Sequence, residues 1–208
     1  MQIDKIKAVI FDCDGVLFNT IKANETYYNM VLDHMKKPLL SEEQLKKVHM
    51  FSVNDSMKYL FKNEPDLLEK AMEFKKTINY IDLLPLLTEE PYLKETLSKL
   101  NDNFILGIAT NRTNTMDILL EKHDLEHFFK IVVTASSVKN PKPAPDQLFM
   151  IMKELMLEKD EMVFIGDSIT DSKAASSAKV PFISYKYKDA ENAVHKINDL
   201  RDIYRLLA

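Results

Sequence analysis

The chain has 208 residues, which suffices for one large domain or for a core with a small second unit. A formal net charge of −4 gives no electrostatic reason to expect nucleic acid or an anionic membrane as a partner, and no apolar run approaches the roughly 20 residues that span a bilayer. The single cysteine excludes an internal disulfide framework and is compatible with a reducing compartment. Since we find no signal peptide before the first predicted strand, we expect a cytoplasmic protein.

The first predicted element is a buried strand in the apolar run of residues 6–11, which Asp12-Cys13-Asp14-Gly15 brings to an end. Residues two apart in an extended chain point the same way, so Asp12 and Asp14 can face one pocket while Cys13 faces the other side. Two carboxylates held this close repel each other unless a cation lies between them. The end of the first strand is therefore a candidate cation site.

The next stretch, residues 18–85, is predicted to be entirely helical. Apolar residues recur at helical spacing, Ser41 to Gln44 has the pattern of a capping box, and Pro38 and Pro85 end two of the helices. The predicted helices cover residues 19–37, 41–50, 52–61 and 66–84.

Short apolar strands then alternate with helices, a pattern typical of right-handed βαβ units around a parallel sheet. We therefore predict an α/β fold, a doubly wound parallel sheet formed by residues 1–17 and 86–208, with residues 18–85 inserted after the first strand. The predicted strands are 104–110, 131–134, 162–166 and 181–185, and the predicted helices are 93–100, 114–123, 146–156 and 171–178, with amphipathic helices from there to the end of the chain.

Polar residues follow the strands, and the carboxyl ends of parallel strands meet at one edge of a sheet, where ligands bind. The residues are Asp12 and Asp14 after the first strand, Thr110, Asn111 and Arg112 after the second, Lys142 in the proline-rich stretch 139–146 after the third, and Asp167 and Asp171 after the fourth. Gly15 and Gly166 stand beside these acids in a chain with three glycines, so we expect them where the backbone turns tightly or approaches a ligand closely.

This set of side chains suits phosphoryl transfer through a covalent aspartyl phosphate. The acids can hold Mg²⁺, a hard cation that prefers carboxylate oxygen and that neutralises charge on a phosphoryl group. Lys142 adds a second positive charge, and the Thr110 hydroxyl with nearby backbone N–H groups can bind the remaining phosphoryl oxygens. One acid attacks phosphorus, and its neighbour two residues on protonates the leaving oxygen and then activates water.

Four ordered stretches also resemble a known family. Asp12-Cys13-Asp14-Gly15-Val16, Thr110, Lys142-Pro143-Ala144-Pro145-Asp146 and Gly166-Asp167-Ser168-x-x-Asp171 are similar to the motifs of the haloacid dehalogenase (HAD) superfamily. Residues 18–85 resemble the helical cap of its phosphoglycolate phosphatase and β-phosphoglucomutase branch. The resemblance implies a Rossmann-like core and a Mg²⁺ cofactor.

The resemblance also implies a role for each site residue. Asp12 would be the nucleophile and a metal ligand, and Asp14 the general acid and base, with its backbone carbonyl on the metal. Thr110, Asn111 and Lys142 would hold the phosphoryl group. Asp167 would bind Mg²⁺, with Asp171, Gly15 and Gly166 in support.

Two features separate the branches of the family. True dehalogenases lack the second acid of the first motif, so Asp14 argues against dehalogenation. Gly166-Asp167 favours a phosphatase, because β-phosphoglucomutase-like members tend to carry Glu-Asp there. We therefore predict a Mg²⁺-dependent phosphatase, phosphoglycolate phosphatase-like, that acts on a small phosphate ester and is a monomer or weak homodimer without nucleic-acid or membrane partners.

Two other functions stay open at this point. A sugar phosphomutase is the main alternative. A receiver-like signalling module is disfavoured because a helical insert of roughly 70 residues follows the first strand.

Some residues allow two interpretations. Lys139 competes with Lys142 as the site lysine, and Arg112 suits either a substrate contact or solvated surface. Cys13 is expected to pack in the core. His123 and His127 could form a metal pair if helical, but a basic helix end followed by a loop is the favoured interpretation.

Overall fold

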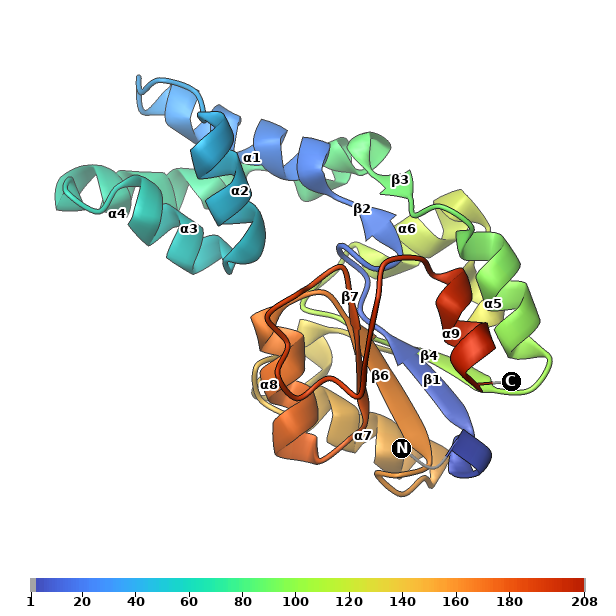
Figure 1. Cartoon of the computed structure of the whole chain (residues 1–208). Helices are drawn as coiled ribbons and strands as arrows, with labels where there is room; N and C mark the ends of the chain where they lie inside the picture. The colour runs from blue at the N-terminus through green and yellow to red at the C-terminus, as the bar shows by residue number, and fades with distance from the viewer. Residues whose placement is uncertain (1–2, 208) are drawn as a thin grey trace. The chain divides into compact units, whose positions relative to one another are not determined.

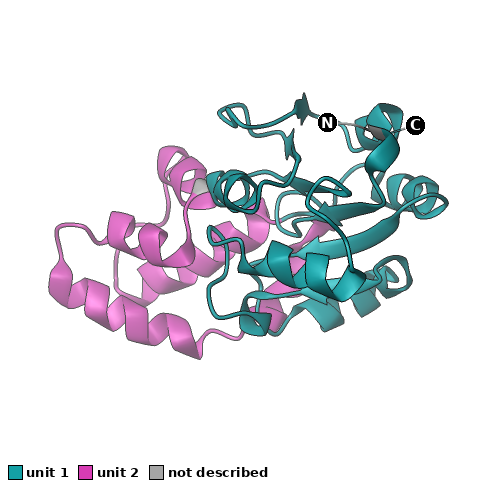
Figure 2. Cartoon of the chain, turned by 90° about the horizontal axis from the view of Figure 1, so that it is seen from below, with its two compact units in different colours: residues 1–19, 89–208 teal, residues 20–88 magenta. Residues whose placement is uncertain are grey.

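The computed structural model describes residues 3–207 and divides the chain into two compact units. One unit holds residues 1–19 and 89–208, and the other holds residues 20–88 (Figure 2). These boundaries lie two to three residues beyond the predicted ones at 17/18 and 85/86. No helix in the described range is long and apolar enough to cross a membrane.

A parallel sheet forms the centre of the first unit (Figure 1). Among the described residues its strand order is β5-β4-β1-β6-β7-β8, and the neighbouring strands pair in parallel. This order confirms the predicted doubly wound α/β fold. The strands are β1 (Ala8–Phe11), β4 (Ile105–Ala109), β5 (Ile131–Val133), β6 (Met162–Gly166), β7 (Phe182–Tyr185) and β8 (His195–Ile197).

The central position of β1 explains its composition. All of its residues are buried, and Ala8 pairs with Ile105 of β4 on one side and with Met162 of β6 on the other. A strand with a neighbour on each side and helices over both faces has no side that meets solvent, so its apolar run is uninterrupted.

Helices cover both faces of the sheet. α7 (Asp146–Leu155) and α8 (Ile169–Ala178) lie on one face, and α5 (Leu93–Asn101) and α9 (Arg201–Leu207) on the other (Figure 1). Beneath α7 and α8 the core includes Ile10, Phe164, Leu148, Ile151, Ala174 and Ala175. α6 (Met116–His123) follows β4 in the chain.

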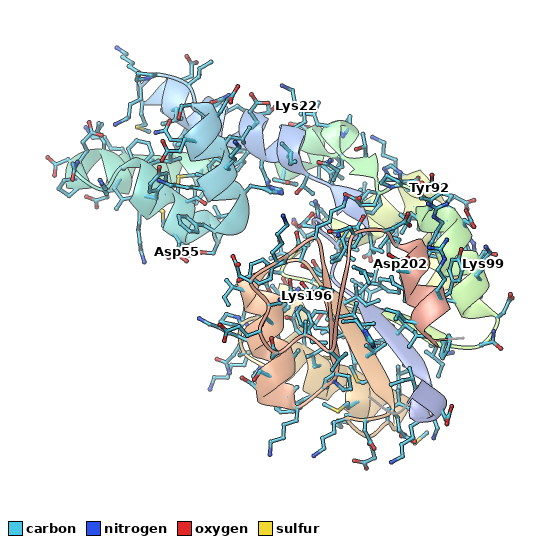
Figure 3. The ribbon with its side chains drawn as sticks, in the orientation of Figure 1. Lys22, Asp55, Tyr92, Lys99, Lys196 and Asp202 are labelled. Atoms are coloured by element: carbon cyan, nitrogen blue, oxygen red, sulfur yellow. The ribbon has the colours of Figure 1, made fainter. Side chains whose placement is uncertain are left out.

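Polar side chains tie α9 to α5. Lys99 Nζ lies 3.2 Å from the Tyr204 hydroxyl oxygen, and the Arg201 guanidinium lies 3.5 Å from the centre of the Tyr92 ring. Figure 3 labels Tyr92 and Lys99 beside Asp202 of α9. The C-terminal helix is thus fastened to the helix that follows the insert.

The second unit is helical, with α1 (Ile21–His34), α2 (Glu42–Met50), α3 (Val53–Leu60) and α4 (Pro65–Phe74), followed by the 3₁₀ segments η2 (Lys75–Thr77) and η3 (Tyr80–Leu86). The predicted capping box is present, since Ser41 accepts from Gln44 N and Gln44 accepts from Ser41 N. His34 of α1 stacks on Phe74 of α4 with ring centroids 3.7 Å apart.

The structure corrects the expected length of two helices in this unit. α1 ends at His34 and not at residue 37, because Lys36 adopts a left-handed φ of 57°. The helix predicted for residues 66–84 ends at Phe74, and Asn79 then accepts a hydrogen bond from Ile81 N to start η3. Pro85 therefore lies inside a 3₁₀ segment rather than ending an α-helix.

The expectation of helices alone after residue 185 was wrong. β8 extends the sheet, with Ile183 of β7 paired to His195 and Tyr185 to Ile197. β8 is a short edge strand in which Ile197 is buried while His195 and Lys196 are half-buried and exposed, so its apolar signal is too weak to detect in the sequence. The final helix, α9, was expected.

The two connections between the units are tied to the sheet. β2 (Phe18–Asn19) and β3 (Thr88–Glu89) form a small two-stranded sheet, and Glu90 N donates to Leu17 O at 2.9 Å. The buried Glu90 carboxylate accepts from the Tyr185 hydroxyl at 2.7 Å and from Lys186 Nζ at 2.6 Å. The end of β7 therefore anchors the point where the chain returns to the core.

Two neighbouring residues of α7 provide a test of this packing. Leu148 is fully buried against the sheet, while Phe149 is 49% exposed. We expect Leu148→Ala to lower the free energy of unfolding by about 2–5 kcal/mol, because it leaves a cavity in the core. Phe149→Ala should change it by less than about 0.5 kcal/mol. Urea titrations of both variants measure this, and equal losses would contradict the packing described.

Candidate active site

The acidic side chains converge where the strand order of the sheet reverses. β4 and β5 extend the sheet from one side of β1, and β6, β7 and β8 extend it from the other. Asp12 directly follows β1, Asp167 directly follows β6, and Asp171 lies in the first turn of α8. Carboxylate oxygens of these three residues lie within 4.8 Å of one another. In doubly wound sheets this switch point is where ligands bind.

Two glycines make room for these acids. Gly15 has a φ of 79°, in the left-handed region, and a Cβ atom there would lie 1.8 Å from Asp167 Oδ2. A Cβ atom on Gly166 would lie 2.4 Å from Asp171 Cβ. A side chain at either position would displace a carboxylate, so the glycines permit the close approach that their place in the sequence suggested.

Lys142 is the cation at the centre of the cluster. Its Nζ lies 2.8 Å from Asp12 Oδ1 and 2.6 Å from Asp171 Oδ1, and it donates to Ala109 O at 2.9 Å. The residue is buried, whereas Lys139 is exposed. Of the two lysines considered from the sequence, the structure brings Lys142 to the acids.

Asp171 is held more tightly than a merely supporting residue requires. Its Oδ1 faces Lys142 and its Oδ2 accepts from Ser168 N at 3.1 Å and from the Ser168 hydroxyl. Ser168 is the N-cap of α8, and Asp171 is the third residue of the helix, so the two form a capping box. The helix start thus fixes an acid that belongs to the cluster itself.

Burial strongly affects the ionisation of this cluster. Burial, reinforced by the negative charge of Asp171 and opposed by Lys142, raises the pKa of Asp12 to about 7. Burial and the charges of Asp171 and Asp12 raise the pKa of Asp167 well above its usual range. Burial disfavours the charge on Lys142, but Asp12 and Asp171 outweigh it and raise the pKa of the ammonium. The acids of this cluster therefore share the positive charge of Lys142, which offsets only part of the cost of ionising them.

Asp14 has a different partner from Asp12. Its Oδ1 accepts from Arg112 Nη2 at 2.6 Å and from Arg112 Nε at 3.0 Å, and its side chain is 40% exposed. The Arg112 side chain is 4% exposed, which excludes the interpretation of Arg112 as solvated surface. Asp12 and Asp14, which the sequence predicted could face one pocket, are thus paired with different cations, Lys142 and Arg112.

The two phosphate-binding loops predicted from the sequence are joined by a residue that sequence reasoning missed. Gln147, fully buried in the first turn of α7, donates to Thr110 O at 2.6 Å and accepts from Lys142 N at 3.1 Å. Asn111 Nδ2 adds a bond to Lys142 O at 2.9 Å. Thr110 is buried. No spacing rule marks Gln147, and its place directly after the lysine motif is its one sequence signal.

Cys13 and the two histidines have structural roles. Cys13 is buried as expected, and burial raises the pKa of its thiol. His123 Nδ1 lies 2.9 Å from Glu89 Oε1, and the ring packs edge-on against Phe18. His127 lies outside α6, in the 3₁₀ segment η4 (Glu126–Phe128). The favoured interpretation, a basic helix end followed by a loop, agrees with this placement.

The donor set fits a divalent cation. Hard cations bind carboxylate oxygens, and the cluster of Asp12, Asp167 and Asp171 offers these from three segments of the chain. With Asp14, four carboxylates face the two cations Lys142 and Arg112, so full ionisation leaves two negative charges uncompensated. A divalent cation would balance them.

Residues 9–185 match the family described as haloacid dehalogenase-like hydrolase. The chain belongs to this family. This confirms the predicted family and the predicted enzyme class, a hydrolase whose named relatives are phosphatases.

Three similar proteins illustrate the relationship. Pyrophosphatase PpaX of Bacillus pumilus is 30% identical over 195 residues, which cover 92% of this chain and 89% of that protein. Phosphoglycolate phosphatase of Nitrosospira multiformis is 30% identical over 216 residues, covering 97% and 88%. The crystal structure of a HAD-superfamily hydrolase, subfamily IA, variant 1, from Geobacter sulfurreducens is 36% identical, covers 98% and 97% of the two chains, and has a TM-score of 0.83.

The raised pKa of Asp12 predicts how stability depends on pH without metal. The folded protein keeps a proton on Asp12 up to about pH 7, whereas the unfolded chain loses it near pH 3.8. The contribution of Asp12 to stability should therefore fall between these values as the pH rises. We expect wild type to lose at least about 1.4 kcal/mol more than Asp12→Asn between pH 5 and pH 8 in chelator.

Chemical denaturation of both proteins at each pH measures this difference. Divalent metal should stabilise wild type more at pH 8 than at pH 5, because the ligand acids must be ionised to bind it. A wild-type protein that gains stability relative to Asp12→Asn as the pH rises would contradict the description of the cluster.

Proposed function

We propose that this chain is a Mg²⁺-dependent phosphatase that hydrolyses a small phosphate monoester through an aspartyl phosphate on Asp12. The observation that carries the proposal is the position of Asp12 at the switch point of the sheet, buried between Lys142 and two further acids. Phosphoryl transfer of this kind requires a nucleophilic acid, a second acid two residues on, a lysine and a metal-binding cluster.

In the first step, an oxygen of the Asp12 carboxylate forms a bond to phosphorus while the bond from phosphorus to the ester oxygen breaks. Lys142 holds Asp12 through Oδ1, and Cys13 N donates to the same oxygen at 2.7 Å, so the carboxylate is oriented before substrate arrives. Lys142 also places positive charge beside the phosphoryl oxygens. Thr110 and Asn111, on the loop joined to Lys142, provide further donors to them.

Asp14 handles the protons of both steps. Its carboxyl group gives a proton to the leaving oxygen as the ester bond breaks. In the second step, the Asp14 carboxylate takes a proton from water as the water oxygen attacks phosphorus, which releases inorganic phosphate and restores Asp12. Asp14 can serve both steps because its side chain is half-buried while that of Asp12 is nearly enclosed.

Mg²⁺ would be held by Asp12, Asp167 and the backbone carbonyl of Asp14, with Asp171 close to them. When bound, the metal supplies positive charge that offsets the negative charge of the acids and of the phosphoryl group. Magnesium fits better than a softer metal because the donors are carboxylate oxygens.

The names of the relatives support a proposal for the substrate class. Phosphoglycolate phosphatase and pyrophosphatase PpaX are names of proteins that are 30% identical to this chain over most of its length. We propose phosphoglycolate, a phosphate monoester, as the substrate to test first, and pyrophosphate, a phosphate anhydride, as the alternative. The helical unit, residues 20–88, would act as a cap that selects the substrate, because it interrupts the chain eight residues after Asp12.

The proposal is tested by phosphate release with Mg²⁺ from phosphoglycolate, pyrophosphate, sugar phosphates and nucleotides. Multiple turnovers with phosphoglycolate, lost in excess chelator, are expected. Phosphate release from pyrophosphate alone would replace the monoester with an anhydride as the substrate. Isomerisation of a sugar phosphate without net phosphate release would replace the phosphatase with a mutase. Labelling of the protein that stops at one phosphate per chain would replace it with a receiver-like module.

Asp12→Asn removes the attacking oxygen and is expected to lower kcat by at least about 1,000-fold, because an amide is a poor nucleophile. The fold should survive, since the substitution removes a charge that burial disfavours. Steady-state phosphate release and thermal unfolding measure the two effects. Near-normal turnover by a folded Asp12→Asn protein would refute the assigned nucleophile.

The two lysines of one loop offer a matched comparison. Lys142→Ala removes the charge beside Asp12 and is expected to lower kcat by about 100-fold or more, in the range of lost electrostatic stabilisation of a transition state. Lys139→Ala, at an exposed position three residues away, should leave kcat within about twofold of wild type. Similar losses in both variants would count against the role of Lys142.

A further inference from the structure

Arg112 is a buried cation whose side chain contacts Asp14, the proposed proton donor. This arginine is the third residue after β4, and its backbone N–H donates to the Thr110 hydroxyl at 3.2 Å. The guanidinium reaches Asp14 with two of its nitrogens and donates from Nη1 to the Thr115 hydroxyl at 3.0 Å. Thr115 is the N-cap residue of α6. The Arg112 side chain is thus held by Thr115 as well as by Asp14, and its backbone is held by Thr110.

Both bonds from Arg112 to Asp14 end on the same oxygen. Nε lies 3.0 Å and Nη2 lies 2.6 Å from Oδ1. In the usual bidentate pair, two nitrogens of an arginine donate to the two different oxygens of a carboxylate. The pair of Arg112 and Asp14 is therefore not of this kind. Holding Oδ1 from two directions fixes the rotation of the carboxyl group, and neither bond uses Oδ2.

The chemistry of a carboxyl group then assigns different tasks to its two oxygens. Arg112 has no acceptor, so Oδ1 must remain an acceptor whether Asp14 is ionised or protonated. A proton on Asp14 therefore resides on Oδ2. The arginine itself stays in place because a buried guanidinium is costly without its partner.

We infer that Arg112 is a positioning residue, which directs Oδ2 of Asp14 toward the ester oxygen of the substrate and keeps the transferable proton on that oxygen. This rests on the proposed function. In the first step the proton on Oδ2 passes to the leaving oxygen as the bond from that oxygen to phosphorus breaks. In the second step Oδ2 takes a proton from the attacking water.

A merely structural role for Arg112 would have another signature. Loss of a buried ion pair lowers stability, and a loosened site slows the reaction of every substrate alike. A positioning role weakens proton donation in particular, so the loss depends on how much the leaving group needs a proton. p-Nitrophenolate leaves readily without one, whereas an alkoxide does not.

The experiment compares kcat/KM for p-nitrophenyl phosphate and for phosphoglycolate, an alkyl ester, in wild type, Arg112→Met and Arg112→Lys. kcat/KM covers the steps from substrate binding through the first irreversible step, and the proton donation lies among them. We expect Arg112→Met to lose about 100-fold on the alkyl ester, at the low end of general acid catalysis, and at most about fivefold on the aryl ester. Arg112→Lys, which restores one donor, should recover part of the loss on the alkyl ester.

Arg205→Met is the matched control, because the Arg205 side chain is 57% exposed and pairs with Asp202 in α9, away from the site residues. This variant should have the same kcat/KM as wild type for both substrates. Thermal unfolding shows whether each variant is folded. The inference would be overturned if Arg112→Met lost kcat/KM equally on the two esters, or lost none on either. If the Arg112→Met protein is unfolded, the same comparison is made with Arg112→Lys. A wild-type protein that hydrolyses neither ester would defeat the proposed function instead, so the two failures are distinguishable.

Discussion

The ion cluster around Lys142 is the interaction on which the rest of the site depends. An ammonium group that is almost fully removed from water requires partners for its charge and its protons, and Lys142 finds them in Asp12, Asp171 and Ala109 O. These partners come from the ends of β1 and β4 and from the first turn of α8. One side chain therefore fixes the relative positions of segments that are far apart in the sequence.

Several backbone features follow from this cluster. The acids come so close that Gly15 and Gly166 have no room for a side chain. The loop that carries Lys142 must be held at the depth of the sheet, and Gln147 does this by bonding both to Lys142 N and to Thr110 O. The Ser168 capping box orients Asp171 from the other side. Each of these features restricts which residue types can occupy its positions, and each lies within a few residues of a motif.

Much of this organisation could be predicted from the sequence because strand ends carry the chemistry. The apolar runs of β1, β4 and β6 are long enough to identify, and in a parallel sheet their ends share one edge. β8 escaped detection because a three-residue edge strand has one buried side chain. The end of α1 was misplaced because Lys36 adopts a left-handed conformation that no sequence signal at that position announces.

Partners within the site were harder to predict than its members. The motifs identified Asp12, Asp14, Lys142 and Asp171, yet nothing in their spacing says which acid faces which cation. That choice depends on the loops after β4 and β5, whose conformations are set by tertiary bonds such as those from Gln147 to Thr110 O and from Arg112 to Asp14. Arg112 was ambiguous for the same reason, because its side chain pairs with Asp14, which lies 98 residues earlier in the chain.

The division of cations between Asp12 and Asp14 has a chemical consequence. A nucleophile should be oriented and enclosed, and Asp12 is held by Lys142 and Cys13 N with its side chain only 11% exposed. A group that exchanges protons with both a leaving group and water must keep one oxygen accessible, and Asp14 is held through a single oxygen with its side chain half-exposed. Two identical side chains, two residues apart, thus acquire different properties from their partners. β1 ends at Phe11, but Asp12 N still donates to Ile165 O of β6 at 2.8 Å. Asp12 therefore remains with the sheet, while Asp14 turns toward the loop of Arg112.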